Sequence, residues 1–142
     1  DYEGHDFWGE CITSPHYARA SSALSSQGIQ SYGANNIKDY DPRTAWVEGK
    51  SDYGIGEYFS VHGNAFWMAE IYIFNGYQRS YSSWKNNSRV KRFRVYVDNR
   101  PICYLELKDK MGGQHFNFDD YNLYDNFGAN GNWENLKFKF EV

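Results

Sequence analysis

The stretch RFRVYV, residues 92–97, alternates arginine or tyrosine side chains with apolar ones. A period of two places the apolar residues on one face of a β-strand and the polar residues on the other. The same alternation runs through WMAEIYIF at 67–74, CYLELK at 103–108 and LKFKFE at 136–141. The sequence therefore predicts several strands that each bury one face.

Turn signals separate these strands. Asn-Gly at 75–76, Gly-Gly at 112–113 and a polar run at 119–132 favour turns, and residues 98–101 are expected to form a hairpin turn. A short helical piece is expected only at 34–38. Many short strands without a long helical period are typical of an all-β sandwich or barrel.

The chain has 142 residues and shows neither an internal repeat nor a linker, so we expect one domain. Residues 1–19 have less pattern and are expected to form an arm or strap, with the sandwich over 20–142. No apolar run approaches the roughly 18 residues that a membrane-spanning helix needs. No signal peptide stands at Asp1, as would also be true of a trimmed chain.

The composition narrows the classes of partner. The net charge of −3 gives no general attraction to nucleic acid or to an anionic membrane, although residues 79–100 hold seven Lys or Arg and one acid. Aromatic residues make up 20% of the chain. Because Trp and Tyr combine an apolar body with a polar tip, this surplus belongs either to a β-rich core or to a binding surface.

The two cysteines, Cys11 and Cys103, leave two alternatives open. They form one disulfide between the N-terminal segment and a later strand, or they are two unpaired thiols in the core. Their spacing excludes a CxxC redox or zinc motif.

A loop-rich stretch, TAWVEGKSDYGIGEYF at 44–59, combines a tryptophan, two glutamates and several glycines. This mixture suits a shaped loop surface better than a buried strand. Just before it, Asp39, Asp41 and Thr44 lie around Pro42 in a tight turn whose oxygen atoms suit Ca²⁺, although the EF-hand pattern is not met. The alternative is an Asx turn in which the aspartates cap local amides.

Ordered motifs along the chain resemble a known family. They are SSALSSQGIQSYGANN at 21–36, TAWVEG at 44–49, GIGEYF at 54–59, IFNGYQRS at 73–80 and NNSRVKRF at 86–93. Together they cover residues 20–97 and resemble the discoidin-like glycan-binding module that is attached to bacterial NAD glycohydrolases. The resemblance implies a galactose-binding-like jelly-roll β-sandwich with a non-catalytic, carbohydrate-directed role. It also implies an exported bacterial protein, whether extracellular, cell-surface or periplasmic.

The resemblance further implies a structural Ca²⁺ in the acidic turn. Its ligands would be Asp39, Asp41 and Thr44, with a backbone oxygen of Lys38. Related modules usually continue into a last strand with an acidic residue near this site. Either Glu141 takes the place of that residue, or the strand is missing from this sequence.

A sugar site needs an aromatic face for the C–H side of the ring and planar polar side chains for adjacent hydroxyls. The motifs supply candidate faces in Trp46, Tyr77, Tyr81 and Trp84, and candidate polar partners in Glu48, Glu57, Asn75, Asn87 and Arg89. Two of these aromatic residues lining one groove with Glu48 or Arg89 would support a sugar site.

Most of these candidates also have a structural alternative. Trp46 stands at the edge of an expected strand, which favours burial over exposure. Glu48 and Glu57 are equally suited to hold Arg89 or Arg79 in an ion pair. Asn75 precedes a glycine and is first of all a turn residue.

These observations favour a glycan-binding module, and the alternative is a protein-interaction or adhesion module on the same fold. Catalysis is not expected. Glu48 and Glu57 would suit glycoside hydrolysis only as a pair about 5–10 Å apart across a substrate. The sequence has no nucleophile elbow, HExxH motif or phosphate loop. Apart from Ca²⁺, no cofactor is expected.

Overall fold

The computed structural model describes residues 17–29, 31–37, 41, 43–50, 54–66, 68–128 and 131–142. Lys38, Asp39 and Cys11, to which the sequence analysis assigned roles, lie outside these ranges. The expected Ca²⁺ turn is therefore described only in part, and the pairing of Cys11 is not described. Cys103 is a free, half-buried thiol in this structure.

The regular elements are short. The strands are β1 (Tyr17–Ala20), β2 (Tyr58–Gly63), β3 (Glu70–Phe74), β4 (Arg92–Val97), β5 (Arg100–Glu106), β6 (Gly113–Asn117) and β7 (Leu136–Glu141). The helical pieces are a 3₁₀ turn at Ala34–Ile37, the α-helix α1 at Tyr81–Asn86, a 3₁₀ turn at Asp119–Tyr121 and a π-helical turn at Tyr124–Gly128. Strand and loop thus dominate the described residues, as the alternating sequence predicts.

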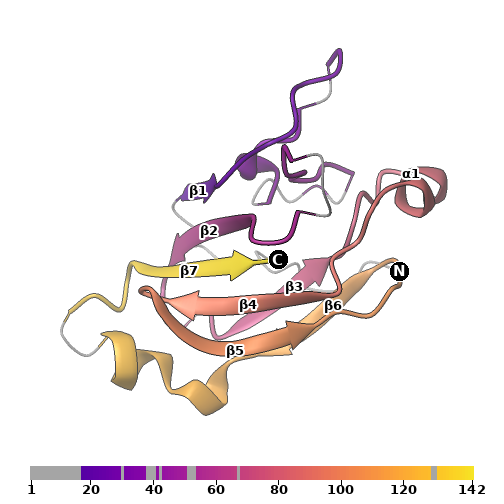
Figure 1. Cartoon of the computed structure of the whole chain (residues 1–142). Helices are drawn as coiled ribbons and strands as arrows, with labels where there is room; N and C mark the ends of the chain where they lie inside the picture. Colours follow the sequence, from indigo (N-terminus) through magenta and orange to yellow (C-terminus); the bar gives the residue numbers. More distant parts are fainter. Residues whose placement is uncertain are drawn as a thin grey trace.

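The strands form two antiparallel sheets around one core (Figure 1). The larger sheet has the order β1-β2-β7-β4-β5, and β3 pairs with β6 in the smaller sheet. Because β7 lies between β2 and β4, the larger sheet joins segments that are far apart in the sequence. The fold is a β-sandwich.

The alternation in the sequence sorts side chains between the core and the solvent. In β4, Phe93, Val95 and Val97 are buried, whereas Arg94 on the other face is exposed. Ile71 of β3 is fully buried and joins the same core from the smaller sheet. Burying one such apolar side chain contributes roughly 1.5–3 kcal/mol, so the pattern specifies which face of each strand turns inward.

The hairpin between β4 and β5 is tighter than expected. β4 ends at Val97 and β5 begins at Arg100, with Asp98 and Asn99 at φ values of +47° and +68°. Such two-residue turns match the twist of the adjoining strands, and Asn and Asp tolerate positive φ. Pro101 therefore lies inside β5, where it is tolerated because β5 is an edge strand.

The sequence did not predict β1, β2, β6 or α1. β1 pairs with β2, so the sheet begins at Tyr17, three residues before the boundary expected at residue 20. α1 falls in the polar stretch 78–88, which was expected to be a loop. A helix start signal is present there, because the Ser83 N–H donates to Ser80 Oγ at 3.0 Å in an N-terminal cap.

The pairing registers bring several loops to one end of the sandwich. β2, β4 and β6 begin at this end, and β3, β5 and β7 finish there. Residues 75–91 and 107–112 therefore meet the segments 43–50 and 54–57 at this end, which we call the loop end.

Candidate functional site

A cavity of about 540 Å³ opens at the loop end. Its inner part is formed by core residues, among them Phe59, Phe93 and Phe140. Six of the residues expected to bind a ligand line it, namely Trp46, Glu48, Asn75, Tyr77, Asn87 and Arg89. The structure therefore brings together residues from segments more than forty positions apart in the chain, and it places Trp46 and Tyr77 in one cavity with Glu48 and Arg89.

Three of the expected residues lie outside the lining. Trp84 is buried beside it, with 9% of its surface exposed. Tyr81 is 62% exposed on α1 and packs against Trp84, with ring centroids 6.1 Å apart. Glu57 accepts a hydrogen bond from the Ser22 hydroxyl, which holds Glu57 against a neighbouring loop.

Trp46 is anchored at both ends of its ring system. Its indole N–H donates to the Ser22 carbonyl at 2.8 Å, and its ring meets Phe59 edge-on with centroids 5.4 Å apart. The Gly49 N–H donates to the Ser22 hydroxyl at 2.9 Å, which ties the same loop together. Trp46 is thus half-buried, in keeping with the structural alternative, and still lines the cavity.

Glu48 lies against Gly54. A Cβ atom at Gly54 would stand 2.9 Å from Glu48 Cγ, and the φ of Gly54 is +72°, so two independent reasons favour glycine there. Within the described part of the chain, the Glu48 carboxylate forms no hydrogen bond or ion pair. A half-buried carboxylate at a cavity wall is an acceptor that a ligand can use.

Tyr77 follows the turn after β3 and meets Tyr32 edge-on, with ring centroids 6.1 Å apart. The backbone of Tyr32 contacts the Trp46 loop, because the Tyr32 carbonyl accepts a hydrogen bond from the Val47 N–H at 3.2 Å. Tyr77 is half-buried, so part of its surface stays accessible at the cavity.

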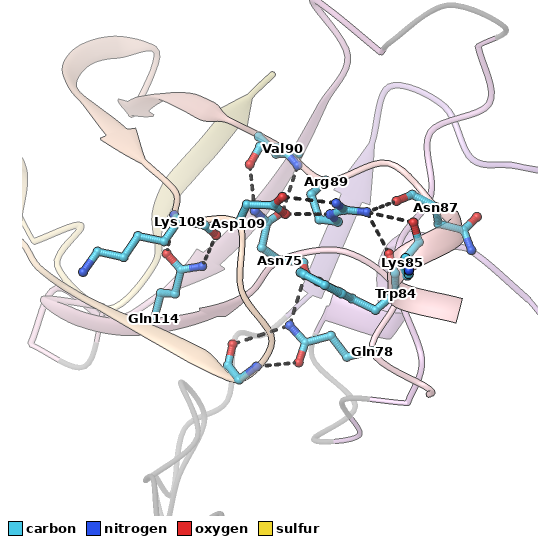
Figure 2. A network of polar contacts seen from close by, with 11 residues as sticks. Asn75, Gln78, Trp84, Lys85, Asn87, Arg89, Val90, Lys108, Asp109 and Gln114 are labelled. Carbon is cyan, nitrogen blue, oxygen red and sulfur yellow. Dashed lines mark hydrogen bonds and ion pairs between the residues drawn. The ribbon is translucent and has the colours of Figure 1, made fainter. Parts of the chain in front are cut away.

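The nitrogen and the oxygen of the Asn75 side chain both form hydrogen bonds inside the protein (Figure 2). Its Nδ2 donates to the Val90 carbonyl at 2.7 Å, and its Oδ1 accepts from the Val90 N–H at 2.8 Å. Its backbone carbonyl accepts from the Trp84 indole at 3.0 Å. These contacts clamp the segment after β3 to the segment before β4, so the position of Asn75 at the cavity is a structural one.

Arg89 is also held by partners within the protein. It binds Asp109 through two hydrogen bonds of 2.7 and 3.2 Å, and its third nitrogen donates to the Trp84 and Asn87 carbonyls at 2.9 and 2.7 Å (Figure 2). Its guanidinium stacks over the Trp84 ring at 4.4 Å. The carboxylate that pairs with Arg89 is therefore Asp109, rather than Glu48 or Glu57.

The pKa of the Asp109 carboxyl is lowered, chiefly because Arg89 donates hydrogen bonds to it. The sequence offered no signal for Asp109, which is an exposed acid in a loop. Ser22 and Tyr32 were missed as well. Both lie in the motif at 21–36, and only the folded loops show that they support Trp46 and Tyr77.

The two polar neighbours of α1 have different roles. Asn87 ends the helix, because its Nδ2 donates to the Ser83 carbonyl at 2.7 Å, and it remains exposed at the cavity. Gln78 joins the loop after β3 to the loop before β6, since its amide exchanges hydrogen bonds of 3.0 and 3.4 Å with the Gly112 backbone. Figure 2 shows the Gln78 contacts beside those of Asn75 and Arg89.

The described half of the acidic turn resembles an Asx turn. Asp41 Oδ1 accepts from the Arg43 backbone N–H at 3.0 Å, and both carboxylate oxygens bind the Arg43 guanidinium at 2.9 and 3.1 Å. These hydrogen bonds lower the pKa of the Asp41 carboxyl. The Thr44 hydroxyl donates to the Asp41 carbonyl at 2.9 Å.

A Ca²⁺ ion would have to compete with Arg43 for the Asp41 carboxylate. Glu141, the expected substitute ligand, ends β7, and its carboxylate lies 3.8 Å from Lys139 Nζ. The described ranges contain no group of three or more His, Cys, Asp or Glu side chains that could hold a metal. Because Lys38 and Asp39 lie outside those ranges, the Ca²⁺ site stays a prediction.

Comparison with known proteins shows which family the chain matches. A family model described as "NAD glycohydrolase translocation F5/8 type C domain" matches residues 10–142. No curated protein and no solved structure matches the chain. Among the described residues, no helix has the length and apolar character to cross a membrane. The match confirms both the family resemblance and the expected discoidin jelly-roll sandwich.

Proposed function

Because the chain belongs to the NAD glycohydrolase translocation F5/8 type C domain family, we propose that it is a non-catalytic module that binds carbohydrate in the cavity at the loop end. One observation carries the proposal. Trp46 and Tyr77, two aromatic residues, line the same cavity as the Glu48 carboxylate. A pyranose ring needs this combination, an apolar face together with a fixed acceptor for its hydroxyls.

The structure narrows the residues that would touch the sugar. Asn75 and Arg89 have their polar atoms engaged within the protein, so they support the cavity wall. Trp46 and Tyr77 remain as the aromatic faces, and Glu48 and Asn87 as the hydrogen-bonding partners. A cavity of about 540 Å³ falls within the range of roughly 300–1,000 Å³ that small-molecule sites occupy.

A hydrolase is less well supported. A glycosidase needs two carboxyl groups on either side of the scissile bond. Glu48 lines the cavity, whereas Glu57 lies outside the lining and accepts a hydrogen bond from Ser22. The family description names translocation, which supports a module of an exported protein.

The direct test is titration of the folded chain against a panel of oligosaccharides, followed by calorimetry on any sugar that binds. Tyr77→Ala should weaken binding by about two- to tenfold, because an aromatic stacking contact is worth roughly 0.5–1.5 kcal/mol. Tyr81→Ala is the matched control. It removes a tyrosine that is 62% exposed and outside the lining, so affinity should not change.

Two results would contradict the proposal. One is the failure of the folded chain to bind any sugar of the panel at millimolar concentration. The other is an equal loss of affinity in Tyr81→Ala and Tyr77→Ala. Repeating the titration with a chelator tests the Ca²⁺ prediction separately, since a structural ion near Asp41 would make affinity or thermal stability depend on the chelator.

A further inference from the structure

The outer face of the larger sheet, which points away from the core, carries a row of cations and tyrosine rings. Six side chains alternate across four neighbouring strands in the order Arg92, Tyr104, Arg94, Tyr96, Lys139 and Tyr58. We call this row the cation–tyrosine ladder. It crosses β5, β4, β7 and β2, which lie side by side in Figure 1.

Each cation of the ladder lies over one or two rings. Arg92 Cζ is 5.2 Å from the centroid of Tyr104, and Arg94 Cζ is 5.8 Å from Tyr104 and 5.2 Å from Tyr96. Lys139 Nζ is 4.2 Å from Tyr96 and 5.1 Å from Tyr58. A cation within about 6 Å of a ring centroid is attracted by the ring, so the rings hold these cations in place.

The strand register explains why the ladder forms. Arg94 is opposite Tyr104 across the β4–β5 pair, and Tyr96 is opposite Lys139 across the β4–β7 pair. Residues opposite each other on antiparallel strands have their side chains about 5 Å apart on one face. The ladder is therefore built into the sheet and does not depend on loop conformation.

Two of the three cations of the ladder form an ion pair, and the third, Arg94, does not. Arg92 binds Glu106 at 2.5 Å, and Lys139 Nζ lies 3.8 Å from the Glu141 carboxylate. Arg94 is exposed, and Glu141 lies opposite it across the β4–β7 pair. Among the residues that the structure describes, no carboxylate forms an ion pair with Arg94. Its guanidinium therefore keeps its hydrogen-bonding edge open.

An arginine held between two tyrosine rings is a prepared site for a carboxylate. A guanidinium binds a carboxylate through two parallel hydrogen bonds. Because it is weakly hydrated, removing water from it on binding costs little free energy. Tyr and Arg are also the residues most enriched in protein–protein interfaces. We propose that the cation–tyrosine ladder is a docking surface for a protein partner that presents carboxylate groups, with Arg94 as the central contact.

Charge favours a carboxylate-bearing protein over a polyanion. Glu106 and Glu141 lie within the ladder and would repel the closely spaced phosphates or sulfates of nucleic acid or a sulfated glycan. The chain as a whole has a net charge of −3, so it offers no wider positive field for such a polymer. A single carboxylate at Arg94 brings less negative charge to this face than such a polymer does, so it is repelled less.

The surface is separate from the proposed sugar site. Arg94, Tyr96, Tyr104 and Lys139 do not line the cavity, and of the ladder residues Arg92 alone does so. Loss of sugar binding and loss of partner binding therefore test different parts of the molecule.

The test measures fluorescence anisotropy of a labelled decapeptide of Gly and Ser with one central Glu and an amidated C-terminus, titrated with the whole chain at low ionic strength. The unmodified chain should bind it. Arg94→Gln should weaken binding about fivefold, as expected for one exposed charge pair, and Arg94→Glu more strongly. The affinity of Arg94→Lys for the peptide should lie between those of the unmodified chain and Arg94→Gln. Lysine keeps the positive charge but cannot form the two parallel hydrogen bonds of a guanidinium.

Lys110→Gln, which removes an exposed cation in the loop after β5, is the matched control and should bind like the unmodified chain. Thermal unfolding of each variant shows that the sheet is intact, and Tyr77→Ala should bind the peptide normally. Equal binding by Arg94→Glu and the unmodified chain would overturn the proposal. Tighter binding of heparin or an oligothymidylate than of the peptide would overturn it as well.

Discussion

Asn75 shows how one residue can look like a ligand contact in sequence and act as a clamp in the fold. Only 3% of its surface is exposed, and its amide satisfies both backbone groups of Val90. A buried polar side chain is tolerated when its donors and acceptors are all matched. Asn75 therefore stabilises the cavity wall and does not offer its side chain to a ligand.

Asn75→Asp tests this assignment. The carboxylate would keep an acceptor for the Val90 N–H and lose the donor to the Val90 carbonyl, at a site with almost no solvent. We expect a loss of about 1–3 kcal/mol in the free energy of unfolding, measured in urea at neutral pH. Asn135→Asp, at an exposed position, is the control and should change little. Equal stability of both variants would show that the clamp is not needed.

The helix α1 depends on its surroundings. Six residues are too few for a stable helix in water. The tertiary contacts that hold it are the buried Trp84 and the hydrogen bonds from Arg89 to the carbonyls of Trp84 and Asn87. Gly76 lies directly beneath this arrangement, since a Cβ there would stand 2.7 Å from Arg89 Cγ and 3.2 Å from Trp84 Cδ1.

Gly76→Ala should therefore displace α1. The change combines a positive φ of +87° with a close contact to Arg89 and Trp84. Gly112→Ala is a matched control, because Gly112 has nearly the same φ, +91°, with no atom within 4 Å of a Cβ. Both variants should have a lower free energy of unfolding, and Gly76→Ala should lower it by more than about 1 kcal/mol. Only Gly76→Ala should increase hydrogen exchange in residues 81–86, and an equal increase in both would contradict the packing argument.

Across the whole molecule, the ion pair of Arg89 with Asp109 joins the segment before β4 to the loop after β5. The two strands are neighbours in the larger sheet, so the pair closes the loop end across that hairpin. Hydrogen bonds from Arg89 lower the pKa of Asp109 below its usual value of 3.8. Such a carboxylate stabilises the folded chain above pH 3.8, and this contribution disappears as the pH falls through the lowered pKa.

Asp109→Asn should lower the melting temperature at pH 7, where the carboxylate of the unmodified chain is ionised and paired. The difference between the two proteins should shrink as the pH falls below 3.8, because the unmodified chain also loses its charge there. Thermal unfolding of both proteins between pH 2 and pH 7, followed by circular dichroism, measures this. A difference that does not vary with pH would show that the ion pair contributes nothing to stability.

Much of the sandwich could be predicted from the sequence. The alternation in β4 and β7 correctly identified both the strands and their buried faces, because a period of two leaves a clear mark on six residues. β1 and α1 were missed, since four and six residues carry too little pattern of their own. The motifs lie together at one end of the molecule, where six of the nine expected ligand residues line one cavity.

The amino-acid sequence by itself determined the β class, the family and the inward face of each long strand, because these depend on local periodicity and on ordered motifs. Only the tertiary structure decided which polar side chains are already engaged. Arg89 meets Asp109, twenty positions away, and Trp46 meets Ser22. It also placed Arg94 between two tyrosines on neighbouring strands. These pairings follow from strand register and loop convergence, which depend on contacts between distant segments and leave no local mark in the chain.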